Sequence, residues 1–417
     1  MRLVHSFNYK TNDYESLILG YLTYASARLY NVGLYERYEY KKLGYESMPD
    51  WYEQKRKLKN DIWFKSLPSQ TAQDVLQRVD EGFKSYFKLL KTKGIQNPDG
   101  PHYKKKNSHY NIKYLNNSFK LIDNKIRLMI PKGLLNHLIE KGFDIKDKFL
   151  YVKLNKMVNN IKQIEIKYIN DFEYEFKIIY EIEDVEMKKD NGRYLSIDMG
   201  INNLIAAYDN KGYSFIIKGN SYQNTLYYYN KTISYYQSLE AKFKNISKET
   251  NYISTKRIKK LNKIKKRKIE CILHTSTRRI VDYCVDNEIH TVIIGDIKGI
   301  RKDNDKGKIT NQKLHSLPFK QFYDKLSYKL KMKGISLIFQ KESYSSGCSP
   351  TSKDVSKEYY NKTKRIKRGL FKDGNMIYNS DSVGAYNIMR IYKKEKGVAI
   401  AMPIKGLSNP TVINVSV

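Results

Sequence analysis

Hydrophobic and polar residues alternate at the start of the chain. Leu3, His5, Phe7 and Tyr9 fall on one side of the first ten residues, a period of two that predicts a β-strand. From residue 14 to residue 95 the apolar positions recur at helical spacing instead. The clearest case is SLPSQTAQDVLQRVDEGFKSYFKLL, whose apolar side chains follow an i, i+3, i+4 pattern: Val75, Leu76, Val79, Phe83, Phe87 and Leu90.

The pattern changes again after residue 95. The runs FKLIDNKIRLMIP and QIEIKYINDFEYEFKIIYEIE predict short strands, and NPDGPHYKKKN predicts a loop with a cluster of positive charge. The sequence therefore predicts a helical domain at 14–95 and a β-rich domain built from 1–13 and 96–190.

Strands and helices alternate from residue 191 onward. YLSIDMGINNLIAAYD predicts a strand, a turn and a strand, and a helical stretch follows from about 221 to 288. The next elements are a strand at 291–296, a helix at 318–333, a strand at 335–342 and a last helix in SDSVGAYNIMRIYKK. This alternation is typical of an α/β sheet domain, which we expect at 191–400, followed by a C-terminal tail at 401–417.

Charge narrows the partners of the chain. The chain has 77 Lys and Arg against 43 Asp and Glu, which gives a net charge of +34 and a pI near 9.6. An AT-rich genome would explain the preference for Lys over Arg, but not the shortage of acids. Such an excess repels itself in a compact fold, so a polyanion, and hence nucleic acid, is the expected partner.

The positive charge is concentrated in a few segments. KRIKKLNKIKKRK at 256–268 has nine cations and no acid, with Ile258, Leu261 and Ile264 as its apolar stripe. A solvated charged helix is the ordinary explanation for such a run, but the missing acids favour contacts with phosphates. The expected nucleic-acid contacts are Lys104, Lys105, Lys106, Lys256, Arg257, Lys259, Lys260, Lys263, Lys265, Lys266, Arg267, Lys364, Arg365, Lys367 and Arg368.

Membrane and secreted classes fit the sequence poorly. The N-terminal residues MRLVHSFNYKTND contain no apolar signal segment, and no stretch of eighteen apolar residues occurs. The three cysteines, Cys271, Cys284 and Cys348, are far apart, which predicts a reducing compartment and no disulfide framework. We therefore expect a cytoplasmic protein, associated with the nucleoid when it is bound to DNA, and no membrane partner.

Two acids lie where a hydrolytic metal site is usually built. Asp198 ends the apolar run YLSID, and Asp381 opens the last predicted helix. The ordinary explanation for Asp198 is a turn-capping residue. If both meet at one edge of the sheet, they can hold Mg²⁺, a hard ion that prefers carboxylate oxygens. A two-metal phosphodiesterase site needs at least a third such group.

Five segments together resemble a known family. These are LSIDMGINNLIAAYD, the helix STKRIKKLNKIKKRKIECILHTSTRRIVDYC, TVIIGDIKGIR, ESYSSGCS and KRIKRGLF with NSDSVGAYNI. Their order and spacing resemble the RuvC-type nuclease half of TnpB (OrfB) proteins, which are transposon-associated, RNA-guided DNA endonucleases related to type V CRISPR effectors. The resemblance covers roughly 190–395. It implies an RNase H-like fold with three carboxylates and Mg²⁺, preceded by a helical recognition domain and a β-rich wedge domain that hold a guide RNA and a target duplex.

The chain departs from that family at its third carboxylate. Most members have Glu at the position of Gly295. The neighbouring Asp296 is an alternative ligand, although side chains along a strand alternate between faces and the alternation relaxes only at a strand end. Glu342 ends the next strand, which in an RNase H-like sheet of order 3-2-1-4-5 lies beside the strand of Gly295, about 4.8 Å away. The resemblance then implies a relocated RuvC glutamate, as in some TnpB and Fanzor members, with Asp198, Glu342 and Asp381 as catalytic metal ligands. The ordinary alternative for Glu342 is a solvated strand-end acid.

A second departure concerns zinc. The family often has a CxxC…CxxC ribbon between its last two motifs, a tetrahedral signature, but this chain has only Cys348 there. We therefore expect residues 345–378 to form a basic insert without zinc.

The sequence thus predicts a Mg²⁺-dependent, RNA-guided DNA endonuclease that pairs its guide RNA with target double-stranded DNA beside a short flanking motif. Two alternatives remain: a nuclease-dead, RNA-guided repressor, and a basic transposition accessory protein without cleavage activity.

Overall fold

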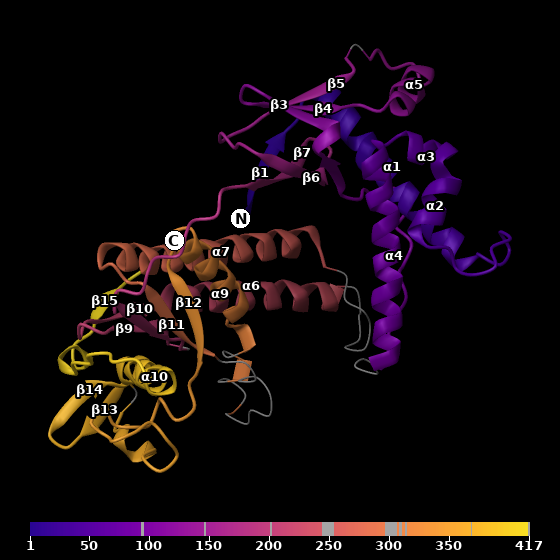
Figure 1. The fold of residues 1–417 in the computed structure, drawn as a ribbon. Coiled ribbons are helices and arrows are strands. Elements are labelled where there is room, and N and C mark those ends of the chain that lie inside the picture. The colour runs from indigo at the N-terminus through magenta and orange to yellow at the C-terminus, as the bar shows by residue number, and fades with distance from the viewer. Residues whose placement is uncertain are drawn as a thin grey trace. The chain divides into compact units, whose positions relative to one another are not determined.

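The structure, a computed structural model, describes residues 1–92, 96–145, 147–200, 202–243, 254–296, 307, 311–312, 315–367 and 369–415. The chain divides into two compact units, Met1–Glu183 and Asp184–Val417 (Figure 1). Arg368, one of the expected nucleic-acid contacts, lies outside the described residues. None of the helices in the described ranges is long and apolar enough to cross a membrane.

The helices of the first unit are α1 (Asp13–Tyr38), α2 (Trp51–Lys57), α3 (Ile62–Lys65) and α4 (Ser69–Thr92). Helix α1 begins with a capping box, in which the Asn12 side chain accepts from the backbone of Glu15 and the Glu15 side chain accepts in return from the backbone of Asn12. The predicted stripe of α4 is buried as far as Phe83. Phe87 and Leu90 are 41% and 45% exposed, because the apolar pattern continues beyond the part of the helix that is packed.

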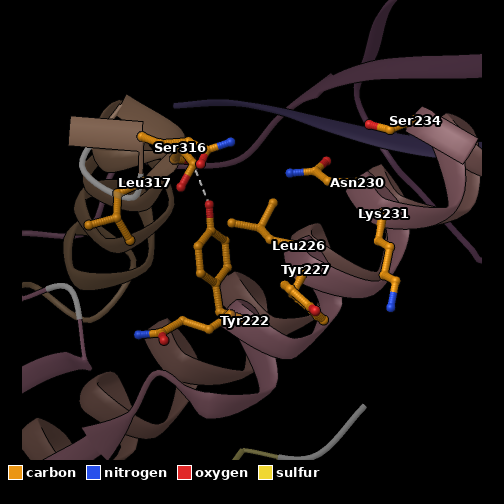
Figure 2. Close-up of a pocket in the computed structure, with 10 residues that line it drawn as sticks. Tyr222, Leu226, Tyr227, Asn230, Lys231, Ser234, Ser316 and Leu317 are labelled. Atoms are coloured by element: carbon orange, nitrogen blue, oxygen red, sulfur yellow. Dashed lines mark hydrogen bonds between the residues drawn. The ribbon is translucent and has the colours of Figure 1, made fainter. Parts of the chain in front are cut away.

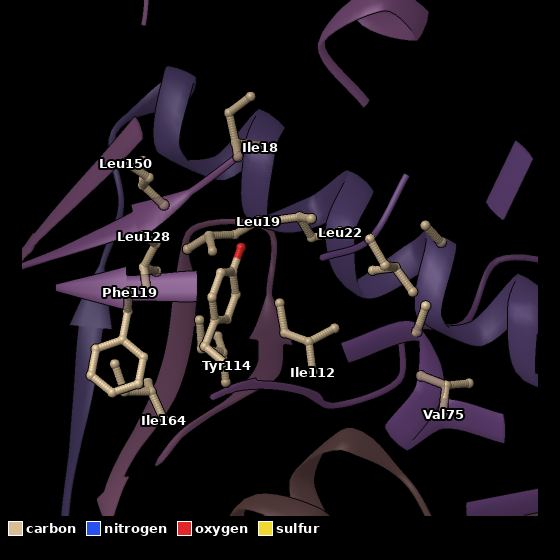
Figure 3. Packing of buried hydrophobic residues seen from close by; sticks show 14 of the residues in the cluster. Ile18, Leu19, Leu22, Val75, Ile112, Tyr114, Phe119, Leu128, Leu150 and Ile164 are labelled. Atoms are coloured by element: carbon tan, nitrogen blue, oxygen red, sulfur yellow. The ribbon is translucent and has the colours of Figure 1, made fainter. Parts of the chain in front are cut away.

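Two antiparallel sheets complete the first unit. One has the order β1-β7-β6-β2, made of Arg2–Lys10, Glu173–Glu181, Ile161–Asn170 and Ile112–Leu115. The other is β3-β4-β5, made of Phe119–Ile122, Lys125–Met129 and Phe149–Lys153. Between β4 and β5 the chain forms a helix that was not predicted from the sequence, α5 (Lys132–Glu140). Figure 3 shows side chains from α1, α4 and both sheets around Tyr114, all members of one hydrophobic cluster. The helical and β-rich segments therefore share one core.

The second unit contains a six-stranded sheet in the order β12-β11-β8-β9-β10-β15. Its strands are β8 (Tyr194–Asp198), β9 (Asn203–Asp209), β10 (Ser214–Lys218), β11 (Thr291–Asp296), β12 (Ser336–Lys341) and β15 (Thr411–Ile413). Strands β8, β9 and β10 pair antiparallel, whereas β11 is parallel to β8 and β12 is parallel to β11. If β15 is left aside and the other five strands are numbered along the chain, their order across the sheet is 3-2-1-4-5. Strand β15 comes from the predicted tail and pairs with the edge strand β10.

Helices cover both faces of this sheet. They are α6 (Asn220–Phe243), α7 (Lys256–Asp286), α9 (Phe319–Lys331) and α10 (Ser380–Lys396). Ile197 and Ile294 join a cluster with Phe322 of α9 and residues of α7. Tyr194 and Ile293 join a separate cluster with residues of α10. Alternate residues of β8 and β11 thus face α10, which decides where their terminal side chains lie.

The remaining elements are short. The hairpin β13 (Leu370–Asp373) and β14 (Met376–Asn379) lies within the predicted basic insert. Single 3₁₀ turns occur at Leu58–Asn60, Asn116–Ser118, Lys362–Lys364 and Lys405–Leu407.

Candidate active site and nucleic-acid interface

Asp198 ends β8 on the face that packs against α10. Two residues earlier on the same face, the Ser196 hydroxyl donates to the Ala385 carbonyl of α10 at 2.7 Å. A Cβ at Gly384 would lie 2.3 Å from Oδ2 of Asp198, closer than any side chain allows. Gly384 therefore lets the Asp198 carboxylate approach the helix. Gly384 was not among the predicted site residues. A Gly within a predicted helix, three positions after Asp381, indicates close packing and could have pointed to it.

Glu342 follows β12 and reaches over the neighbouring strand. Gly295 of β11 pairs with Gln340 of β12, two residues before Glu342. A Cβ at Gly295 would lie 2.1 Å from Oε2 of Glu342 and 3.2 Å from Cδ1 of Ile388 in α10. The structure thus places the Glu342 carboxylate in the space that a side chain at position 295 would need, while its role as a metal ligand stays a prediction.

Asp296 falls on the other face of the same strand. Val292 and Ile294 pack in the cluster with α7 and α9, and Asp296 continues their alternation. Gly295 continues the alternation of Ile293, which packs against α10. The strand therefore directs Gly295 toward Asp198 and Asp296 away from it.

Asp381 lies in the first turn of α10 and is held by two asparagines. The Asn379 side chain caps the helix, accepting from the backbone nitrogens of Asp381 and Ser382 at 3.0 and 3.1 Å. Nδ2 of Asn203, the first residue of β9, donates to Oδ2 of Asp381 at 2.7 Å. Asn203 is a second residue that the sequence analysis missed. The sequence feature that could have indicated Asn203 is the polar end of the run DMGINN, which begins at Asp198 and ends at Asn203.

The carboxylates act on one another electrostatically. The pKa of Asp198 is raised well above its ordinary value, first by burial and then by the negative charges of Glu342 and Asp381. The Arg365 guanidinium of the insert opposes this rise. The three acids therefore lie near enough to repel each other, and a cation among them would relieve the repulsion.

The donor set fits a hard divalent cation in its chemistry. Asp198 and Glu342 offer carboxylate oxygens, the ligands that Mg²⁺ prefers, and the spaces above Gly295 and Gly384 admit them. Among the described residues, however, no three His, Cys, Asp or Glu side chains are arranged as a complete metal-binding group. Oδ2 of Asp381 accepts from Asn203, which fixes the orientation of this carboxylate.

The insert between β12 and α10 is organised around Asp373 of β13. The Asp373 carboxylate accepts from the hydroxyls of Ser349 and Thr351 and from Nζ of Lys364, the last at 2.7 Å. Burial alone would raise the pKa of Asp373, but these donors outweigh it and lower the pKa. The Cys348 thiol, the one cysteine of the insert, donates to the Ser356 carbonyl at 3.4 Å.

Helix α10 anchors this insert. Nδ2 of Asn387 donates to the carbonyls of Ser345 and Cys348 at 2.7 and 2.8 Å. Arg390, one turn further along α10, donates to the Ser349 carbonyl at 2.9 Å. The helix that begins next to Asp381 thus also holds the segment that carries Arg365.

The basic segment of α7 presents its charge to solvent. Ile258 is buried with Tyr229 and Ile233 of α6, and Leu261 and Ile264 pack against them, which confirms the predicted apolar stripe. The other side of the helix is exposed at Lys256, Arg257, Lys259, Lys260, Lys263, Lys266 and Arg267. Lys265 is half-buried, and its Nζ donates to Oδ1 of Asn230 in α6 at 3.1 Å.

The other predicted nucleic-acid contacts differ in how exposed their side chains are to solvent. Nζ of Lys104 lies 4.4 Å from the ring centroid of Tyr30 and 4.7 Å from that of Tyr110, and burial lowers the pKa of this lysine. Lys104 therefore packs inward, whereas Lys105 and Lys106 are exposed.

In the insert, Arg365 and Lys367 are exposed. Lys364 is paired with Asp373, so its charge is already balanced within the protein.

Comparison with known protein families gives two matches, which cover most of the second unit and the few residues that precede it. Residues 177–301 match the family OrfB_IS605, described as a probable transposase. Residues 319–388 match the family Cas12f1-like, TNB domain. The resemblance of this part of the chain to TnpB (OrfB) proteins is therefore confirmed, and the second match includes the insert. No curated protein matches the chain.

A solved structure shares the fold, and a second one was compared with the chain. A Cas12f1 structure, determined as a complex with sgRNA and target DNA, superposes with a TM-score of 0.56 at 15% identity, covering 90% of this chain and 82% of that one. A structure of the mini-RNA-guided endonuclease CRISPR-Cas_phi3 has a TM-score of 0.42 at 13% identity, with 97% and 94% covered. The first similarity shows a common multidomain fold of mixed α and β content.

Proposed function

We propose that this chain is an RNA-guided DNA endonuclease of the TnpB type. It would hold a guide RNA, pair it with target double-stranded DNA beside a short flanking motif, and cleave that DNA by Mg²⁺-dependent phosphodiester hydrolysis. The observation that carries the proposal is Glu342, whose carboxylate lies in the space above Gly295 on the face that Asp198 shares. The family matches and the fold shared with Cas12f1 agree with it.

Each unit is proposed to correspond to a domain of such an endonuclease. The second unit is proposed as an RNase H-like, RuvC-type nuclease domain, because its first five strands follow the order 3-2-1-4-5. The helices at 14–95 and the sheets of the first unit are proposed as the recognition and wedge domains, which would read the flanking motif. The proposed place of action is the cytoplasm, on chromosomal or transposon DNA.

Asp198, Glu342 and Asp381 are the proposed metal ligands. Bound there, Mg²⁺ supplies an activated water and stabilises the developing charge on the phosphate. The chain's own residues prepare this site: Gly295 and Gly384 leave room for the carboxylates, and Asn203 orients Asp381. Along α7, the exposed cations would hold the phosphate backbone of the bound nucleic acid, a contact that is largely blind to sequence.

A second candidate function is guided DNA binding without cleavage. The observation that favours it is that, among the described residues, no three His, Cys, Asp or Glu side chains form a complete metal-binding group. Such a protein would act as a repressor.

One experiment separates these functions. The chain is expressed with its flanking gene sequence, the copurifying RNA is sequenced, and a duplex complementary to that RNA is incubated with the complex and Mg²⁺ or Mn²⁺. A discrete guide RNA with metal-dependent cutting, lost in Asp198→Ala, supports the endonuclease. A discrete guide RNA with target binding and no cutting supports the repressor, and RNA of random sequence would leave only a basic accessory protein.

A further inference from the structure

A pocket of about 530 Å³ opens beside the N-terminal half of α6, on the second unit. Figure 2 shows Tyr222, Leu226 and Asn230 along one side of this helix, directed toward the segment that contains Ser316 and Leu317. The spacing of four residues places these three side chains one above another. The buried Tyr222 closes the bottom, and its hydroxyl donates to the Ser316 carbonyl at 2.5 Å.

An aromatic ring and a cation lie at the rim of the pocket. Tyr227 is 70% exposed, so its ring is open to a ligand from solvent. Nζ of Lys231, one turn along, lies 6.0 Å from the centroid of the Tyr227 ring. A flat ring with a positive charge beside it is the arrangement that stacks on a nucleobase and contacts its phosphate.

The pocket is continuous with the basic surface of α7. Asn230 is an exposed residue of the pocket lining, and its Oδ1 accepts from Nζ of Lys265 on α7. Nine cations without an acid lie on residues 256–268 of that helix. A strand whose phosphates follow these cations would therefore pass the mouth of the pocket, and the pocket's occupant would belong to a polyanion.

The lining selects one component of a polyanion. Tyr222, Leu226 and Leu317 provide apolar walls, and Asn230 provides an amide that both donates and accepts, as the edge of a base requires. Bases in a duplex are stacked on each other and cannot enter such a pocket, whereas an unpaired base can.

We infer that this pocket binds one unpaired base of a single-stranded nucleic acid whose phosphates lie along α7. Tyr227 stacks on the base or its neighbour, Asn230 bonds the base edge, and Lys231 contacts the adjoining phosphate. The inference rests on the proposed function only in taking nucleic acid as the ligand, and it does not require cleavage.

The test is direct binding of short labelled oligonucleotides, measured by fluorescence anisotropy with the full chain. The probes are a uridine strand, a thymidine strand and an abasic strand of the same length. Tyr227→Ala is compared with Tyr228→Ala, a matched control, because Tyr228 is the adjacent residue, is 61% exposed and does not line the pocket.

Tyr227→Ala should weaken binding of the strands that carry bases by roughly 5- to 150-fold, the factor that corresponds to loss of one stacked base. Its salt dependence and its affinity for the abasic strand should stay at the wild-type values, because no phosphate contact is removed. A ribose strand that binds more tightly than the deoxyribose strand assigns the pocket to RNA, and the opposite preference assigns it to DNA.

Equal effects of Tyr227→Ala and Tyr228→Ala, or equal wild-type affinity for abasic and normal strands, would overturn the inference. A second set of variants keeps this result separate from the proposed function. Reversing Lys259, Lys263 and Lys266 to Glu should flatten the log–log salt slope by about 0.7 to 0.9 for each lost phosphate contact, with or without cleavage activity. Absence of metal-dependent cutting together with a Tyr227 effect would refute the nuclease and leave the pocket standing.

Discussion

The two ends of the β8–β9 pair each hold an aspartate, and the two aspartates have opposite surroundings. Asp209 ends β9 and is fully buried. Nη1 and Nη2 of Arg193 donate to its two oxygens at 3.0 Å each, and the Tyr283 hydroxyl donates at 2.9 Å. This carboxylate has its positive partner and its hydrogen-bond donors within the protein.

Asp198 is the last residue of β8 and lies at the opposite end of the same antiparallel strand pair. Its neighbours named above are two further acids, Glu342 and Asp381, and the exposed Arg365 is the positive charge that opposes the rise of its pKa. Folding has therefore gathered negative charge at one end and neutralised it at the other. Because unbalanced buried charge is costly, the Asp198 end is expected to be balanced by something from outside the chain.

The largest contrast should appear in cleavage. Asp198→Asn and Glu342→Gln should each lower the rate of target cutting by about three orders of magnitude or more, since metal activation supplies several kcal/mol. Asp296→Asn should change the rate little, because its side chain lies on the face of α9. The measurement is single-turnover cleavage of a labelled duplex with Mg²⁺. An inactive Asp296→Asn beside an active Glu342→Gln would make Asp296 the third ligand.

At the other end the effect should be on stability. Asp209→Asn leaves the Arg193 charge buried without its partner, and we expect the free energy of unfolding to fall by about 3–5 kcal/mol. Chemical denaturation of the purified variant measures this loss. The double variant Arg193→Met with Asp209→Asn should recover part of it, and a double variant less stable than the single one would contradict the pairing.

Gly295→Ala tests the space at the Asp198 end more finely. The new methyl group would lie 2.1 Å from Oε2 of Glu342, so the carboxylate must move. A displacement of this size should reduce cleavage roughly 100-fold, while thermal unfolding stays close to that of the wild type.

The double variant Gly295→Glu with Glu342→Ala is the matching control, because it returns the acid to β11 and clears the space that the Glu342 side chain occupies. It should cut faster than Glu342→Ala alone. Equal rates for these two variants would show that the acid is useful only when it comes from β12.

The smallest expected difference is in the response to pH. The raised pKa of Asp198 means that the folded state binds more protons than the unfolded state above about pH 3.9, the ordinary value for Asp. Without Mg²⁺, stability should therefore fall as the pH rises through the window that ends at the raised pKa. Melting curves of wild type should drop by a few degrees relative to Asp198→Asn over this window, and Mg²⁺ should reverse the drop. Parallel curves for both proteins would contradict this.

Much of the second unit could be predicted from its sequence, because strong apolar periodicity determined its long elements. Strand β11 occupies 291–296 as expected. The order of the first five strands was instead what the family resemblance implied, and the sheet has that order. The position of Glu342 relative to Gly295 could be predicted from this order, since parallel neighbours in known register bring defined residues together.

Other features depend on contacts that a linear pattern does not contain. Asn203 and Gly384 are recognised only when β9 and α10 are seen beside Asp198. The exposure of Phe87 and Leu90 depends on where the packing partners of α4 end. The short strand β15 has too few residues for a periodic signal and is defined by its pairing with β10.

The close approach of Gly295 and Glu342 also has a consequence for mutational history. A glycine codon becomes a glutamate codon by one base change, GGA to GAA, so an acid on β11 is a single step away. That step alone would force a side chain into the space of the Glu342 carboxylate. If Glu342 is the proposed third ligand, its loss first would leave the site without that acid. On this assignment each single-step path between the two arrangements passes through an impaired protein, and a lineage with the acid on β12 would be held there by selection at both codons together.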